Sequence, residues 1–233
     1  MNINTLLGSS NLNNLLGSGS QASQATTATT ATGSPQLAKA EKRIQTDADS
    51  TKAQLSQFGL LKSALSDAQV AAQALSGLTA ASSASDTTVA LGSFFNRFNG
   101  SVNAANAAAT GSAGVSANAK RVVQDLKSAL RADPATEAAM KTLGLSVQSD
   151  GTLAQDAKKF ATALNADPAG VRAALAVVGK KVDAVNSREL ASNGSVGQAL
   201  AGLNQHSTVL TAQQKAMTSL QQAMAAYQAN SAG

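Results

Sequence analysis

The sequence predicts a mostly α-helical protein, an elongated helical bundle or coiled coil of N- and C-terminal helices, with a small β-hairpin in the central region. Apolar side chains recur at helical spacing towards both ends of the chain. The 233 residues include five Phe, one Tyr and no Trp, so few large side chains are available for a deep core. Much of the apolar fraction of 43% is Ala, which favours helices but buries little area.

Residues 1–38 predict a disordered, polar N-terminal tail. They are rich in Ser, Thr, Asn, Gln and Gly and carry no charged side chain. Such a segment buries too little apolar area to offset the entropy of ordering it. Two leucine pairs, Leu6-Leu7 and Leu15-Leu16, leave a second interpretation open, in which the tail orders on a partner and the leucines anchor it.

A long N-terminal helix is predicted over residues 39–76. Its apolar side chains follow steps of three, four or seven residues, or their sums, which places them on one slowly drifting stripe. A helix of this length spans about 60 Å at about 1.5 Å per residue, and its stripe has no partner within the helix itself. We therefore interpret the stripe as part of an assembly interface that contains Leu37, Ile44, Leu55, Phe58 and Leu65.

Residues 89–190 predict a central helical domain, after a break over 77–88 that is rich in turn-type residues. Three of the five phenylalanines lie in one stretch, at positions 94, 95 and 98, and a further helix carries an apolar stripe around Leu126 and Leu130. We expect Phe94, Phe98, Leu126 and Leu130 to form the core, with Phe95 the more exposed of the three phenylalanines.

Local signals predict two helix starts and one hairpin inside this domain. Asp133-Pro134 and Asp167-Pro168 each combine an N-capping carboxylate with a proline at the first helical position. The pair Asp150-Gly151 is a strong turn signal between two short apolar runs, so a hairpin is expected near residues 143–154. The turn should hold Gly151 at a positive φ.

A C-terminal coiled-coil helix is predicted over residues 196–230. Polar residues, including Gln214 and Gln221, occupy the alternate seam positions, so the seam is weak and its partner should come from assembly. An antiparallel return along the N-terminal helix would pair both stripes. The assembly interface on this helix consists of side chains spaced by seven residues: Leu203, Leu210, Met217 and Met224.

The residues that support catalysis or metal binding are scarce. There is no Cys, and the single histidine, His206, has no carboxylate near it in sequence. Asp150 and Asp156 lack the alternating oxygen ligands and the closing Glu of a calcium loop. We therefore predict no catalytic, cofactor or metal site, and expect the protein not to be an enzyme.

Charge and hydropathy exclude other classes of partner. The net charge is +5, but the 18 Lys and Arg are dispersed without interleaved aromatic residues, so nucleic-acid binding is not expected. The sequence contains no apolar run of about 18 residues, so membrane insertion is not expected. The N-terminus lacks the pattern of a cleaved signal peptide. Residues 1–38 and 196–233 together carry one charged side chain, Lys215, so both ends are almost neutral while the middle is charged.

Several short motifs resemble a known family when they are taken in order. The first is Leu143-Gly144-Leu145-Ser146-Val147, followed by Ser149-Asp150-Gly151-Thr152-Leu153, then Asp156, and then Ala166-Asp167-Pro168-Ala169-Gly170-Val171. This order resembles the C-terminal region of flagellar hook-associated protein 2, the filament cap. Upstream, Phe94 to Asn99 resembles that family's Phe-x-x-x-Tyr-Asn signature, with Phe98 in place of Tyr, and Phe58 to Leu65 resembles its N-terminal helix.

The resemblance covers about residues 40–225 and implies a structural flagellar protein that is exported to the outside of the cell without a cleaved signal. Implied partners are further copies of the chain, flagellin or hook-associated proteins, and an export chaperone. This chain departs from the family in one respect. The family has a large insertion that forms the outer plate between the N-terminal helix and the Phe-rich helix, whereas this chain has only residues 77–88 there. Alternatives are a cytoplasmic adaptor or regulator that binds a flagellar export chaperone, and a secreted coiled-coil protein of another appendage.

Overall fold

The computed structural model describes residues 35–111, 113–131 and 133–231, and they form a helical bundle with one small hairpin. The predicted mostly α-helical fold with a central hairpin is confirmed. All contacts described below lie within Gln36–Gly233, the second of the two units into which the chain divides. In chain order the elements are α2 (Pro35–Ser76), α3 (Ala84–Ala108), α4 (Ala113–Ala129), α5 (Pro134–Thr142), β1 (Leu145–Val147), β2 (Leu153–Gln155), α6 (Ala157–Ala166), α7 (Pro168–Leu190) and α8 (Ser195–Ser231).

The predicted N-terminal tail falls largely outside these residues. The leucine pairs Leu6-Leu7 and Leu15-Leu16 lie outside the described part of the chain, whereas residues 35–38 form the first turn of α2. The helix therefore begins four residues before the predicted start at residue 39. Proline at its first position fits, because the N–H that proline lacks would have no partner within the helix there.

Capping side chains determine where the other helices begin. Ser83 and Asp86 form a capping box, each side chain bonding the other residue's backbone N–H at 3.0 Å, so α3 begins at Ala84 and not at the predicted residue 89. Asp133 Oδ1 accepts the Thr136 N–H at 2.8 Å, and Asp167 Oδ1 accepts the Gly170 N–H at 2.8 Å. The predicted helix starts at the two Asp-Pro junctions are therefore confirmed.

The central hairpin pairs β1 with β2 antiparallel, with Val147 opposite Leu153. Asp150 Oδ1 accepts the backbone N–H of Thr152 at 2.9 Å and its hydroxyl at 2.7 Å, which fixes the turn. Gly151 has φ 94°, so the predicted positive φ is confirmed. Asp156, which follows β2, caps α6 by accepting the Lys159 N–H at 3.0 Å.

The core lies among α2, α3, α4 and α7. Phe58 of α2 and Phe94 and Phe98 of α3 are fully buried, and the rings of the latter two have centroids 5.8 Å apart. Leu126 of α4 and Leu130, directly after the end of α4, are also buried in this cluster. Phe95 is half-buried and packs against its edge.

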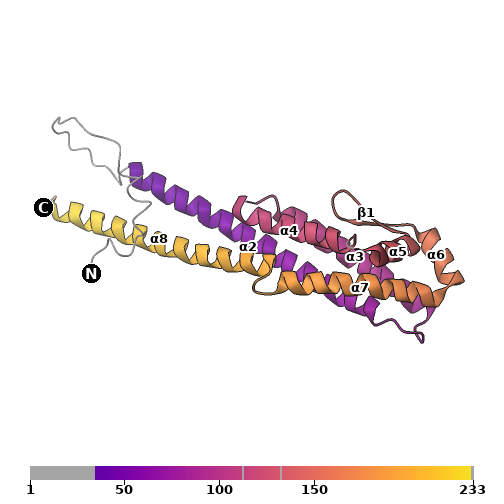
Figure 1. Ribbon diagram of the computed structural model, residues 1–233. Helices are drawn as coiled ribbons and strands as arrows, with labels where there is room; N and C mark the ends of the chain where they lie inside the picture. The colour runs from indigo at the N-terminus through magenta and orange to yellow at the C-terminus, as the bar shows by residue number, and fades with distance from the viewer. Residues whose placement is uncertain (1–34, 112, 132, 232–233) are drawn as a thin grey trace. The chain divides into compact units, whose positions relative to one another are not determined.

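Two helices run along α2, one beside each half. Along its second half lies α7, where Gln69 and Gln73 donate from Nε2 to Asp183 Oδ1 at 3.1 and 3.0 Å. The packing there is close, because a Cβ on Gly179 would lie 2.5 Å from the carbonyl oxygen of Ala72. Beside the first half of α2, α8 runs in the opposite direction (Figure 1).

Candidate functional site

The first turns of α2 and the last turns of α8 form a two-helix segment, here called the terminal helix pair and defined as residues 35–50 and 211–231. Two side-chain hydrogen bonds cross it: Gln214 Nε2 donates to Gln45 Oε1 at 3.2 Å, and Gln221 Nε2 donates to Glu41 Oε2 at 2.9 Å. The seam glutamines of α8 therefore have polar partners on α2. The sequence pattern did not identify Glu41 and Gln45 as these partners, because their spacing within α2 carries no information about α8.

The nine residues predicted as an assembly interface divide into two groups in the structure. Four of them are at most 5% exposed and pack inside the bundle of this single chain: Phe58, Leu65, Leu203 and Leu210. The other five are half-buried: Leu37, Ile44, Leu55, Met217 and Met224. All of the second group except Leu55 belong to the terminal helix pair, so the described residues cover its apolar seam only in part.

The outer face of α8 is apolar in places and has almost no charge. Leu220 is 47% exposed and Tyr227 is 76% exposed, and Val209, about three turns before Leu220, is 48% exposed. Lys215 is the single charged side chain of this helix. A helix surface that combines exposed apolar groups with little charge is suited to packing against another helix.

Polar side chains from α3 and α4 hold the hairpin on the bundle. Asn99 of α3 donates from Nδ2 to the carbonyl oxygen of Leu153 at 3.0 Å and accepts the N–H of Leu153 on Oδ1 at 2.7 Å. Lys127 of α4 donates to the carbonyl oxygen of Ser149 at 2.9 Å, and Arg131, in the turn after α4, donates to that of Val147 at 3.0 Å. Asn99 is the last residue of the Phe-rich motif, so this motif supplies both core side chains and the hairpin contact.

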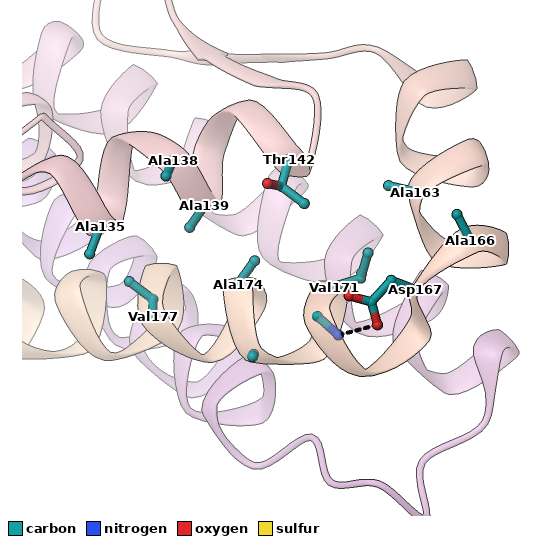
Figure 2. Close-up of a pocket in the computed structure, with 12 residues that line it drawn as sticks. Ala135, Ala138, Ala139, Thr142, Ala163, Ala166, Asp167, Val171, Ala174 and Val177 are labelled. Carbon is teal, nitrogen blue, oxygen red and sulfur yellow. Dashed lines mark hydrogen bonds between the residues drawn. The ribbon is translucent and has the colours of Figure 1, made fainter.

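A cleft of about 430 Å³ lies between α5, α6 and α7 and is lined mainly by alanine side chains (Figure 2). Ala138 and Ala139 of α5 lie across it from Ala174 and Val177 of α7. The carboxylate at its edge, Asp167, is the N-cap of α7 and already accepts the Gly170 N–H. Besides Asp167, the lining includes one further polar side chain, the hydroxyl of Thr142.

A second cleft, of about 340 Å³, lies where α4 meets α2 and α8 and includes Asp47, Thr51 and His206. His206 is exposed on α8. Within residues 35–111, 113–131 and 133–231, no three His, Cys, Asp or Glu side chains are grouped so that they could hold a metal ion. None of the helices in the same residues has an apolar stretch long enough to cross a membrane.

Three aspartates with a lowered pKa serve as caps or turn residues. The ammonium of Lys181 and the backbone N–H of Thr136 lower the pKa of Asp133 to about 2. A hydrogen bond from the Ser83 hydroxyl lowers the pKa of Asp86, and one from the Thr152 hydroxyl lowers that of Asp150. In each case at least one of the bonds that lower the pKa also fixes a helix start or a turn, which for Asp133 is the bond from the Thr136 N–H.

Comparison with known proteins adds the family to this geometry. Residues 79–232 match the family model described as flagellar hook-associated protein 2 C-terminus, and the match spans α3 to α8 with the hairpin and both Asp-Pro junctions. No curated protein and no solved structure matches the chain. The family is one of structural proteins of the flagellar filament cap. Because the matched region covers well over half of the sequence, the chain belongs to the flagellar hook-associated protein 2 family.

Proposed function

We propose that this chain is a structural component of the flagellum that assembles with copies of itself, and contacts flagellin-type helices, through the terminal helix pair. The observation that carries the proposal is the incomplete burial of that pair. Leu37, Ile44, Met217 and Met224 are half-buried although they form its apolar seam. Two helices alone cannot enclose their seam, so further helices from other chains would complete the burial.

The charge distribution supports association at this place. Residues 196–233 carry one charged side chain, so bringing several copies of α8 together involves little repulsion and little desolvation of charge. Leu220 and Tyr227 lie on the outside of α8 and would gain burial in such an assembly. Covering an apolar side chain of this size stabilises a contact by about 1.5–3 kcal/mol when burial is complete.

The connection between α2 and α3 limits what part of a cap the chain can supply. Only residues 77–83 join Ser76 to Ala84, with the capping box directly at the end of the connection. We infer that the chain supplies a helical leg, and that any outer plate is either absent from the assembly or contributed by another protein. Its place of action is then outside the cell, at the filament.

Point substitutions on the exposed face of α8 test self-assembly. Leu220→Glu and Tyr227→Glu place a charge on side chains that are 47% and 76% exposed, so the fold of one chain should be unaffected. Leu60→Glu is the matched control, because Leu60 is 68% exposed on α2, outside the terminal helix pair. Mass in solution and helical circular dichroism are measured as the concentration of the full-length chain rises.

We expect the unmodified chain and Leu60→Glu to gain mass and helicity together, and the two α8 variants to lose most of that gain. Equal association of all four proteins would rule out the outer face of α8 as the interface. Localisation separates the remaining alternatives: a structural role at the filament requires the protein at filament tips or in the culture supernatant. Retention in the cytoplasm with a bound export chaperone would instead support the adaptor.

A further inference from the structure

Three helices meet at a cluster of charged side chains beside the turn between α7 and α8. Glu189, near the end of α7, is 2% exposed, and its Oε2 accepts the N–H of Ser195, the first residue of α8, at 3.2 Å. Arg188 Nε donates to Glu189 Oε1 at 3.2 Å, and its terminal nitrogen lies 3.1 Å from Asp125 Oδ2 on α4. Glu189 therefore caps the start of α8 while Arg188 connects it to α4.

The turn that follows Glu189 is closely packed. A Cβ on Gly194 would overlap the carbonyl oxygens of Arg188 and Glu189, and one on Gly197 would overlap that of Ala191. The backbone of the turn is thus folded directly onto the end of α7. With Ser195 only 5% exposed, water has little access to its N–H, so the Glu189 carboxylate is the acceptor on which this N–H depends.

The charges in this cluster do not balance when both carboxyls are ionised. Asp125 and Glu189 contribute two negative charges. Among the described residues, both carboxylates form ion pairs with the same guanidinium, that of Arg188. Arg121, one turn earlier on α4, is exposed and forms no ion pair within the described residues. From α8 no charged group faces the cluster, because Lys215 is its single charge and His206 lies at the cleft beside Asp47.

We propose that Asp125 and Glu189 form an acid-tightened latch, in which one proton shared by the two carboxyl groups holds the first turn of α8 against α4 and α7. With that proton present, the Asp125 hydroxyl donates to the Glu189 carboxylate, and the one remaining negative charge is matched by Arg188. Without it, two adjacent carboxylates repel each other and compete for the same arginine. The latch is independent of the proposed assembly and concerns the folding of one chain.

The pKa directions of the two groups agree with this arrangement. Burial raises the pKa of Asp125, and the neighbouring Glu189 raises it further. Burial opposes ionisation of Glu189, but hydrogen bonds from Ser195, Asp125 and Arg188 outweigh it and hold the pKa of Glu189 below its ordinary value. The shared proton therefore resides on Asp125, and Glu189 stays ionised as the cap of α8.

The sign of the pH dependence follows from these directions. The raised pKa of Asp125 means that the folded state binds its proton more tightly than the unfolded chain, so stability falls as pH rises from the ordinary aspartate pKa through the raised one. The lowered pKa of Glu189 means that its contribution is lost only as pH falls through that lower value. The junction is most stable at pH values between the lowered pKa of Glu189 and the raised pKa of Asp125.

Asp125→Asn tests the latch, because the asparagine amide can donate to Glu189 at every pH and cannot ionise. Thermal unfolding of the full-length variant and of the unmodified chain is compared from the ordinary aspartate pKa of about 3.9 up to about neutral pH. The two should melt together at the acidic end, and the variant should melt about 2–4 °C higher near neutral pH. Asp67→Asn, which removes an exposed carboxylate paired with Arg97 at 2.8 Å away from this cluster, is the control for the loss of one carboxylate.

Two further measurements keep the test independent of how the variant folds. On the unmodified chain, hydrogen exchange of the Ser195 N–H, corrected for its intrinsic pH dependence, should show protection that decreases as pH rises through the Asp125 titration. NMR titration of the side-chain carboxyls should place Asp125 above Glu189. A pH-independent difference between Asp125→Asn and the parent, constant protection of Ser195, or the reverse order of the two carboxyls would each overturn the latch.

Discussion

The side-chain amide of Asn99 bonds both backbone groups of Leu153, accepting its N–H at 2.7 Å and donating to its carbonyl oxygen at 3.0 Å. This pairing imitates the bond pattern of a neighbouring strand and joins α3 to β2. It satisfies two backbone groups of a half-buried strand with a single side chain, so the hairpin needs no third strand on that edge.

Asn99→Asp should destabilise the chain by about 1–3 kcal/mol. The carboxylate still accepts the Leu153 N–H but has no proton to donate, and it faces the Leu153 carbonyl oxygen at close range. Asn96→Asp is the matched control, because Asn96 is exposed on the same helix and should change stability by less than about 0.5 kcal/mol. Urea unfolding measures both, and equal effects would contradict the role assigned to Asn99.

Gly151→Ala should also be destabilising, by about 1–3 kcal/mol. Gly151 has φ 94°, and a Cβ there would lie 2.8 Å from Val123 Cγ1, so backbone strain and a side-chain clash act together. Gly100→Ala is the opposite case: the residue lies in α3 with open space around a Cβ, and the substitution should stabilise by about 0.5–1 kcal/mol. Melting temperatures that move in the same direction for both would argue against this account.

Replacing the buried phenylalanines tests the position of the core. Phe94→Ala and Phe98→Ala should each cost about 3–5 kcal/mol, because both side chains are fully buried and each loses its contact with the other ring. Phe95→Ala should cost clearly less, since that side chain is half-buried at the edge of the cluster. Denaturant unfolding of the three variants gives the order, and the largest loss at Phe95 would show that the core is misplaced.

Lys181→Met should shift the acid unfolding of the chain to higher pH. Lys181 lies 2.7 Å from Asp133 Oδ2 and is the main cause of the pKa of about 2 at that carboxyl. A lowered pKa contributes stability that is present above the ordinary aspartate pKa and is lost as pH falls through the lowered pKa. Raising the pKa of Asp133 therefore makes the folded chain lose this stability at a higher pH.

NMR titration of the Asp133 carboxyl reports the change directly. The pKa should rise from about 2 only part of the way to the ordinary value, since the Thr136 N–H still bonds the carboxylate. Lys180→Met is the control, because Lys180 is exposed and forms no ion pair with the described residues. An unchanged Asp133 titration in Lys181→Met would show that the ion pair does not form in solution.

Features whose causes act over a few residues follow from the amino-acid sequence alone. Asp133 and Asp167 start their helices because the capping oxygen and the N–H that it bonds lie three positions apart. The positive φ of Gly151 follows from the turn residues directly beside it. The capping box of Ser83 and Asp86 is also a local signal. It starts α3 at Ala84, five residues before the predicted residue 89.

Which apolar residues become buried within the chain depends instead on long-range packing. The seven-residue spacing treats Leu203, Leu210, Met217 and Met224 as equivalent, yet the first two are buried and the last two are half-buried. The difference depends on what packs beside α8: Leu203 lines a cleft together with Val115 of α4, whereas Gln214 and Gln221 in the last part bond side chains of α2. Periodicity within one helix shows which side chains share a face, but it does not show which other helices cover that face.

The same reason applies to the polar contacts that matter most here. Asn99 and Leu153 are 54 positions apart, and the carboxyls of Asp125 and Glu189 come from different helices, so no local pattern pairs them. From the sequence alone, a polar side chain on a helix is predicted to be solvated. Only the fold shows that a backbone group or a second charge lies beside it. Local chemistry therefore specified the elements, and long-range packing specified which of their side chains act together, because burial and electrostatic coupling are properties of neighbours in space.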